Sequence, residues 1–261
     1  MTRSAAAWLP FLHDLADRAD ELARRFFRQT GMRVDTKPDQ SPVSEADAAI
    51  EAMVRALTRE RHPGLGVLGE EDGETGAGGA TRLIVDPIDG TRNFVRGIPV
   101  FATLLAVEHE GEVLAGIVSA PALIQRWHAA RGSGAWSGDR RLRVSTVAQW
   151  PDAQVFFAGI GGAEAQTLPP GLLGLGRRSG RTRGFGDFWQ HALVAEGAGE
   201  LAVDPEVKPW DIAALQVLVE EAGGRATTLT GERSIHCGSL VTSNGLLHAE
   251  ALALLVQSGR D

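Results

Sequence analysis

The chain has 261 residues, of which 43% are hydrophobic and 23% are charged, and its formal net charge at pH 7 is -7. This composition is typical of a globular protein with one large domain or two closely packed halves, and the negative charge argues against nucleic-acid binding through a broad basic surface. The single cysteine, Cys237, excludes an intrachain disulfide bond, and no stretch of sequence is long and apolar enough to cross a membrane. We therefore expect a cytoplasmic protein.

Two segments near the N-terminus, residues 5–29 and 47–57, carry apolar residues at helical spacing. The first also carries acidic residues throughout, which indicates an amphipathic helix and not a signal peptide. We expect a polar loop between the two helices, around residues 37–42. Short apolar runs at 65–68 and 82–86 predict two strands, which an acidic and glycine-rich loop joins.

Strand-like patterns dominate the middle of the chain. Residues 100–108, 112–119 and 124–130 predict three strands, and Gly138 and Asp139 predict the turn of a further hairpin. Because short turns separate these strands, we expect an antiparallel meander. Residues 150–185 offer few regular signals.

The rest of the chain mixes helical and strand-like segments. Such a mixture favours a layered α/β or α+β fold. The segments are helices over residues 187–198, 211–222 and 245–257, and strands over residues 201–203 and 240–242.

The motif Asp-Pro-Ile-Asp-Gly-Thr follows one of the apolar strands. Pro87 has no amide hydrogen, so the strand is expected to end at Asp86. Asp86 and Asp89 then lie on a tight turn, where two carboxylates can bridge hard cations such as Mg²⁺. Gly90 and Thr91 can begin a helix, whose free amides bind phosphate. In isolation, such a motif more often shapes a turn and caps a helix.

Three further carboxylates stand at the ends of expected elements. Glu70 follows the strand at 65–68, Asp47 lies near the start of a helix, and Asp211 follows Trp210 before another helix. Each has an ordinary explanation, namely a solvated loop or a helix cap. Together they gather where active sites of layered folds are found.

These motifs, in this order, resemble those of the inositol-monophosphatase superfamily, and the similarity runs from about residue 37 to residue 224. The resemblance implies an α-β-α-β-α sandwich, with residues 1–261 as one domain in two halves, 1–145 and 146–261. It also implies a homodimer that hydrolyses a small phosphate ester with about two or three Mg²⁺ ions per site. The matching segments are Val43-Ser44-Glu45-Ala46-Asp47, Gly69-Glu70-Glu71, the block 86–91 and Trp210-Asp211.

The resemblance also implies a role for each matching residue. Metal would be bound by carboxylates and one carbonyl, phosphate by backbone amides, and the attacking water would be oriented by Thr91 with Asp47 behind it and Glu70 close by. No covalent intermediate is expected, since a metal-bound water is itself a competent nucleophile. The implied metal ligands are Glu70, Asp86, Asp89, Asp211 and the carbonyl of Ile88, and the implied phosphate ligands are the amides of Gly90 and Thr91.

Within the superfamily, two segments resemble the bacterial histidinol-phosphate phosphatases of histidine biosynthesis. These segments are residues 90–97, with Arg92 and Arg96, and Gly186-Asp187-Phe188-Trp189. We therefore expect L-histidinol phosphate as substrate, with Asp187 and Asp204 as contacts for its amine or imidazole. Alternatively, Asp187 caps a helix and Asp204 lies in a turn.

Three other functions stay open at this point. The first is a related phosphatase acting on inositol monophosphate, fructose bisphosphate or a 3′-phosphonucleotide. The second is a catalytically silent scaffold, against which the complete set of motifs argues. The third is a nucleic-acid binder, which would need a basic patch. His191 is expected to be structural, and the sequence assigns no role to Lys208.

Overall fold

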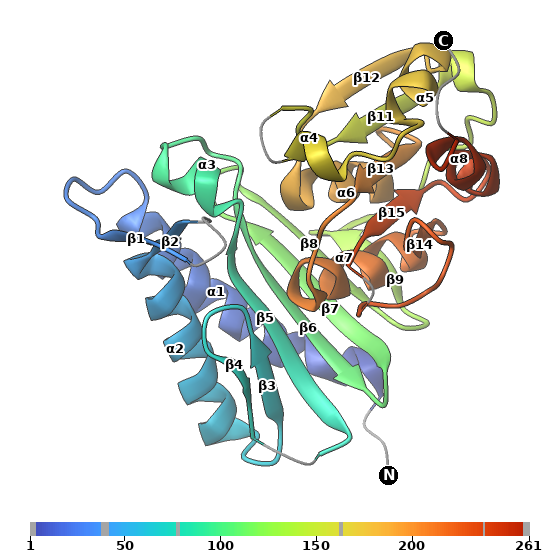
Figure 1. Cartoon of the computed structure of the whole chain (residues 1–261). Helices are drawn as coiled ribbons and strands as arrows, with labels where there is room; N and C mark the ends of the chain where they lie inside the picture. Colours follow the sequence, from blue (N-terminus) through green and yellow to red (C-terminus); the bar gives the residue numbers. More distant parts are fainter. Residues whose placement is uncertain (1–3, 38–41, 77–78, 162–163, 237, 258–261) are drawn as a thin grey trace.

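Two β-sheets are stacked with helices between them and on both outer sides (Figure 1). This computed structural model describes residues 4–37, 42–76, 79–161, 164–236 and 238–257. Cys237 and most of the polar loop expected around residues 37–42 lie outside the described residues. None of the described helices is long and apolar enough to span a bilayer.

The first sheet has eight strands, which pair in the order β10-β9-β8-β7-β6-β5-β3-β4. Consecutive strands from β5 to β10 are antiparallel neighbours, which confirms the predicted meander, whereas β3 lies parallel to β5. Their bounds are β3 (Gly66–Gly69), β4 (Gly73–Thr75), β5 (Thr81–Asp89), β6 (Ala102–His109), β7 (Glu112–Ala120), β8 (Gln125–Ala130), β9 (Gly134–Ser137) and β10 (Arg140–Arg141).

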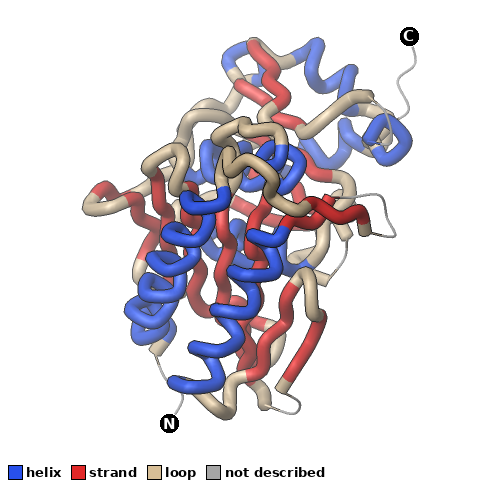
Figure 2. The backbone as a smooth tube through the Cα atoms, turned by 90° about the vertical axis from the view of Figure 1, so that its left-hand side faces the viewer, coloured by secondary structure: helices blue, strands red, loops and turns tan. Residues whose placement is uncertain are grey.

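Two long helices, α1 (Leu9–Phe26) and α2 (Glu45–Arg61), lie side by side over the outer face of this sheet (Figure 2). The 3-10 helix η1 (Ala5–Trp8) precedes α1, and a small antiparallel pair, β1 (Val34–Thr36) and β2 (Pro42–Ser44), leads into α2. α2 begins with a capping box, in which the Ser44 hydroxyl accepts from the amide of Ala46.

The second sheet has five strands in the order β12-β11-β13-β15-β14. β11 lies parallel to both neighbours, and β15 lies antiparallel to both of its own. The elements of this part are η2 (Trp150–Asp152), β11 (Gln154–Phe157), α4 (Glu164–Thr167), α5 (Leu172–Arg178), β12 (Arg181–Gly184), α6 (Asp187–Ala195), β13 (Leu201–Asp204), α7 (Pro209–Glu221), β14 (Arg225–Thr227), β15 (Leu240–Ser243) and α8 (His248–Leu255).

Helix α7 is the centre of the molecule. Its residues 212–219 are all buried, because the first sheet packs on one side and the second sheet with α6 packs on the other. A helix that is apolar all round is stable only when protein surrounds it. Helices α5 and α8 cover the far side of the second sheet. The α-β-α-β-α order of layers is therefore confirmed.

The proline in the Asp-Pro-Ile-Asp motif does not end its strand, and the expected tight turn is wrong. β5 continues to Asp89 through an irregularity: Asp86 pairs with Leu104 of β6, and Asp89 pairs with Ala102. Because a bulge leaves residues out of the ladder, it accommodates the missing amide hydrogen of Pro87. The two aspartates are therefore held by a paired strand.

Several short elements were not predicted. They are β1, β2, β4 and β14, together with all the elements between residues 150 and 185. The expected boundary near residue 145 stays a prediction. The strands of the first sheet precede it and those of the second sheet follow it, while α7 packs against the first sheet.

The close approach of α7 to β7 requires a glycine. A Cβ atom added at Gly116 would lie 2.9 Å from the Cα atom of Ala214 and 2.9 Å from Cγ1 of Val217. Gly116→Ala is therefore expected to lower the free energy of unfolding by about 1–3 kcal/mol. Thermal unfolding measures the effect, at about 2–4 °C per kcal/mol. Gly64→Ala is the control, since a Cβ atom there meets nothing within 4 Å. Equal melting temperatures for the two variants would contradict this packing.

Candidate active site

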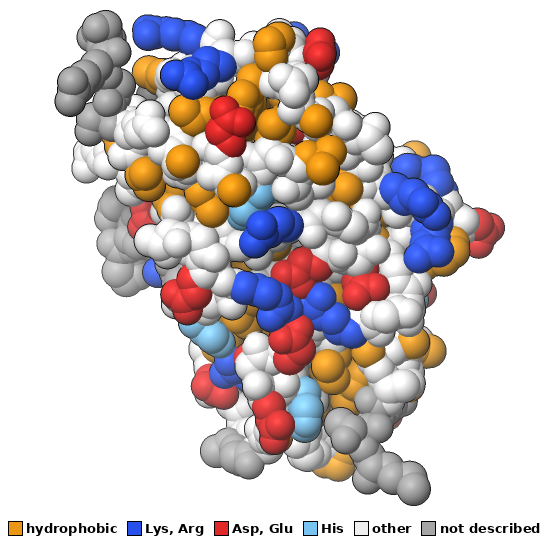
Figure 3. All heavy atoms as spheres, turned by 90° about the vertical axis from the view of Figure 1, so that its right-hand side faces the viewer, with side chains coloured by type: hydrophobic (Ala, Val, Ile, Leu, Met, Phe, Trp, Pro, Cys, Tyr) orange, Lys and Arg blue, Asp and Glu red, His pale blue; other side chains and the backbone are white. Residues whose placement is uncertain are grey.

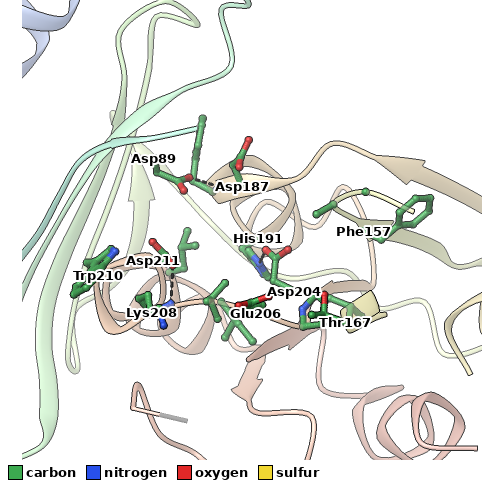
Figure 4. A pocket seen from close by; sticks show the side chains of 18 of the residues that line it. Asp89, Phe157, Thr167, Asp187, His191, Asp204, Glu206, Lys208, Trp210 and Asp211 are labelled. Atoms are coloured by element: carbon green, nitrogen blue, oxygen red, sulfur yellow. Dashed lines mark hydrogen bonds and ion pairs between the residues drawn. The ribbon is translucent and has the colours of Figure 1, made fainter. Parts of the chain in front are cut away.

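A cavity of about 470 Å³ opens between the two sheets. Residues far apart in the sequence face it from both parts of the chain (Figure 4). From the first part come Lys37, Glu70, Asp89 and Arg92, and from the second come Asp187, His191, Asp204, Glu206, Lys208, Trp210 and Asp211.

Three carboxylates meet at one end of this cavity. Oxygen atoms of Asp86, Asp89 and Asp211 all lie within 4.8 Å of one another. Asp86 and Asp89 flank the bulge in β5, and Asp211 lies in the first turn of α7. Among the described residues, Oδ1 of Asp86 is buried and has no hydrogen-bond partner. A buried carboxylate oxygen needs a donor or a cation, so this trio suits a hard divalent metal.

The start of α7 orients Asp211. Lys208 is the N-cap residue, and its backbone amide donates to Oδ2 of Asp211 over 2.7 Å. Pro209 occupies the first helical position, where a missing amide hydrogen costs nothing. Asp211 is therefore the third helical residue and not the N-cap. The backbone of Lys208 has a structural role that the sequence did not indicate.

Glu70 lies beside the trio at the end of β3. The ammonium group of Lys37 contacts Oε1 of Glu70 at 2.7 Å and Oε1 of Glu71 at 2.8 Å. Lys37 was not predicted as a site residue, because its contact with Glu70 joins residues 33 positions apart. The pair places a positive charge next to the acidic end of the cavity.

A buried carboxylate of α2 anchors the loop that carries Glu70. Oε2 of Glu51 accepts from the amide of Glu71 at 2.9 Å, and Oε1 accepts from the amide of Asp72 at 3.0 Å. Glu51 is fully buried and lies over Gly69, where an added Cβ atom would approach within 2.3 Å of Oε1. Because Gly69 has no side chain, the loop can approach Glu51 of α2 closely enough to form these hydrogen bonds.

The structure brings Asp47 and Thr91 together as expected. Oγ1 of Thr91 lies 2.8 Å from the carbonyl oxygen of Ile88 and 3.3 Å from Oδ1 of Asp47. The other oxygen of Asp47 accepts from the amide and the hydroxyl of Ser44. Burial raises the pKa of Asp47. A hydroxyl group next to a buried carboxylate can pass a proton to it.

Gly90 begins the short helix α3 (Thr91–Val95) in the left-handed region, with φ 85° and ψ 34°. A Cβ atom there would lie 2.9 Å from the carbonyl oxygen of Val100 and 3.3 Å from Oδ2 of Asp187. Glycine is therefore required both by the backbone angle and by the space.

Burial and mutual repulsion make the acidic trio hard to ionise. The pKa values of Asp86 and Asp89 are raised well above their usual range, first by burial and then by neighbouring carboxylates, Glu70 for Asp86 and Asp187 for Asp89. Burial also raises the pKa of Asp211 to about 7. Without a cation the protonated forms of these groups are favoured, and a bound metal would favour the charged forms.

Two further carboxylates, Asp187 and Asp204, line the cavity. Asp187 begins α6 but Gly186 is the N-cap residue, and Nδ2 of Asn93 donates to Oδ2 of Asp187 at 2.9 Å. Asp204 is the buried last residue of β13, so the alternative that Asp204 lies in a turn is wrong.

His191 was expected to be structural or exposed, and Gln190 was not predicted as a site residue. In the structure both contact the carboxylate of Asp204. They lie three and four residues after Asp187, the spacing that places side chains on one helical face, and this spacing was the available signal.

Protons and Mg²⁺ should compete for the trio. Because folding raises the pKa of Asp211 to about 7, the contribution of Asp211 to the stability of the metal-free protein falls as pH rises from its unfolded pKa toward pH 7. The melting temperature with Mg²⁺ minus that with EDTA should therefore grow from about pH 5 to about pH 8. This difference removes the opposing effect of His128 and His248, whose pKa values burial lowers to about 4. A difference independent of pH would contradict the expectation.

Comparison with known proteins identifies the family. The family model described as "Inositol monophosphatase family" matches residues 5–260. The chain is 48% identical to a histidinol-phosphatase of Mycobacterium tuberculosis over 92% of this chain and 95% of that protein. It is 43% identical to a histidinol-phosphatase of Streptomyces coelicolor over 95% of this chain and 97% of that protein. An IMPase structure from Thermotoga maritima matches with a TM-score of 0.86 and 31% identity over 95% of this chain and 96% of that one. The chain belongs to the inositol monophosphatase family.

Proposed function

We propose that this protein hydrolyses L-histidinol phosphate to L-histidinol and inorganic phosphate, and that Mg²⁺ is required. The observation that carries the proposal is the charge pattern of the cavity. The cavity is lined by the metal-binding carboxylates and by two further carboxylates, Asp187 next to Asp89 and Asp204 next to His191. A phosphate group suits a metal at the trio, and a cationic amine or imidazole suits the carboxylates that the metal leaves free. The similarity to two histidinol-phosphatases supports the same substrate.

The proposed metal ligands are the carboxylates already described and the carbonyl of Ile88. The orphaned oxygen of Asp86 and the raised pKa of Asp211 fit a divalent cation, which would supply positive charge and make a bound water more acidic. Glu70 would approach the same cation from β3, and Lys37 limits the repulsion that Glu70 exerts on the trio. The number of ions, about two or three per site in the resemblance, stays a prediction.

In the proposed reaction, the amides of Gly90 and Thr91 hold the phosphate group. The Thr91 hydroxyl orients the attacking water, and Glu70 lies close by. A proton from this water is passed through the hydroxyl toward Oδ1 of Asp47. The raised pKa of Asp47 suits it as the acceptor. The attack is in line, and no residue of the chain becomes phosphorylated.

The alternative substrates use the same metal end and differ in the rest of the molecule. An inositol phosphate carries hydroxyl groups and no cation, so it would not balance the negative charges of Asp187 and Asp204. The complete set of carboxylates argues against a silent scaffold. On the face shown in Figure 3, basic and acidic side chains are interspersed, which does not favour a nucleic-acid binder. A homodimer and a cytoplasmic location stay predictions.

The first test compares phosphate release from L-histidinol phosphate and from myo-inositol 1-phosphate. Each substrate is assayed with Mg²⁺ and with EDTA. We expect turnover that depends on Mg²⁺ and a value of kcat/KM that is at least about tenfold higher for the histidinol ester, the effect of one charged contact. Preference for the inositol ester would retain the metal chemistry and overturn the roles proposed for Asp187 and Asp204.

The second test removes one metal ligand. Asp89→Asn retains the shape of the side chain but loses its charge, so kcat at saturating Mg²⁺ should fall by about a hundredfold or more. Asp139→Asn is the matched control, because Asp139 is exposed on the turn between β9 and β10. Wild-type turnover by Asp89→Asn would show that the metal site is assigned to the wrong residues.

A further inference from the structure

Two buried polar side chains hold the carboxylate of Asp204 from behind. Nε2 of Gln190 lies 2.6 Å from Oδ2 of Asp204, and Nε2 of His191 lies 2.9 Å from the same oxygen. Gln190 is 0% and His191 is 1% exposed. Within the described part of the chain, Oδ1 of Asp204 accepts no hydrogen bond, and Asp204 lines the cavity next to His191 (Figure 4). One carboxylate oxygen is therefore engaged by protein and the other faces the cavity.

The ring of His191 is itself held in one orientation. Its Nδ1 lies 2.7 Å from Oγ1 of Thr242, a fully buried residue of β15. In a neutral ring, donation from Nε2 to Asp204 leaves Nδ1 as an acceptor, and the hydroxyl of Thr242 can donate to it. The contacts of Thr242, His191 and Asp204 are then mutually consistent, so each side chain has one preferred position.

Helix α6 connects this arrangement to the metal end. Gln190 and His191 follow Asp187 at the spacing of one helical face, and the backbone amide of Phe188 donates to Oδ2 of Asp89 at 2.5 Å. The first two turns of α6 therefore contact both ends of the cavity. A rigid helix of this kind sets the distance between a bound phosphate group and the carboxylate of Asp204.

We propose that Gln190 and His191 are positioning residues that present Oδ1 of Asp204 to a protonated amine of the substrate. The inference rests on the proposed function and deepens it. Selectivity for phosphate esters with a cationic group then depends on two buried side chains that orient Asp204, in addition to the acids that face the substrate. Oriented carboxylates bind ammonium groups more tightly than mobile ones, because less conformational freedom is lost on binding.

The test uses His191→Phe in the full-length enzyme with saturating Mg²⁺. The KM for L-histidinol phosphate and the inhibition constant of the product L-histidinol should both rise by about tenfold or more. The inhibition constant of inorganic phosphate and kcat should stay within about twofold, since the metal end is unchanged. His191→Gln should recover most of the affinity, because its side-chain amide can donate in place of Nε2.

His248→Phe is the matched control. His248 is also 1% exposed and is held by two hydroxyl groups, Oγ1 of Thr227 and Oγ of Ser243, each at 2.8 Å, but it does not line the cavity. A purely structural role for His191 predicts equal behaviour of the two phenylalanine variants, or equal losses for L-histidinol and phosphate. Either result would overturn the inference. If His191→Phe does not fold, Gln190→Met removes the other contact to Asp204. The same KM, kcat and inhibition constants are then measured for that variant.

Failure of the proposed function can be distinguished from failure of the positioning role. If the wild-type enzyme neither hydrolyses L-histidinol phosphate nor binds L-histidinol, the substrate is wrong and the inference is overturned with it. If the wild type does both and the variants show no selective loss, only the positioning role is overturned.

Discussion

Repulsion between carboxylates that are buried together is the constraint on which the site depends. Asp86, Asp89 and Asp211 have their oxygens within 4.8 Å, and one oxygen of Asp86 has no partner among the described residues. Such an arrangement persists only if the backbone holds each group firmly, because free side chains would turn toward solvent. The strand bulge, the capped start of α7 and the loop anchored by Glu51 supply that restraint. A divalent cation would offset the resulting excess of negative charge.

Different elements carry the residues proposed for the chemistry and those proposed for substrate choice. The residues proposed to hold metal, phosphate and water lie on α2, β5, the segment after β3 and the starts of α3 and α7. The second sheet and α6 supply Asp187 and Asp204, with Gln190 and His191 behind them. The residues proposed for the chemistry and those proposed for substrate choice therefore lie on different elements. Members of one family can then change substrates without altering the carboxylate trio.

The sequence was informative where local signals determine the structure. The meander was predictable because apolar strands and short turns alternate, and the trio was predictable because its members stand in recognisable motifs. The bulge at Pro87 was not, since it depends on pairing with β6. The short strands between residues 150 and 185 are stabilised mainly by their neighbours in the sheet. The contact of Lys37 with Glu70 joins distant segments, which no spacing rule reveals. The spacing after Asp187 places His191 on the same helical face, but it does not reveal the contact of His191 with Asp204.

The central place of α7 has a consequence for how activity is lost. Asp211 reaches the trio only while α7 is packed against the first sheet, and Asp204 stands opposite only while the second sheet is packed on the same helix. On its outer face, each sheet also forms a separate apolar cluster with the helices that cover that face. A partial separation of the layers would leave most secondary structure in place and still dismantle the cavity. Turnover is therefore a more sensitive reporter of layer docking in this protein than helix or strand content.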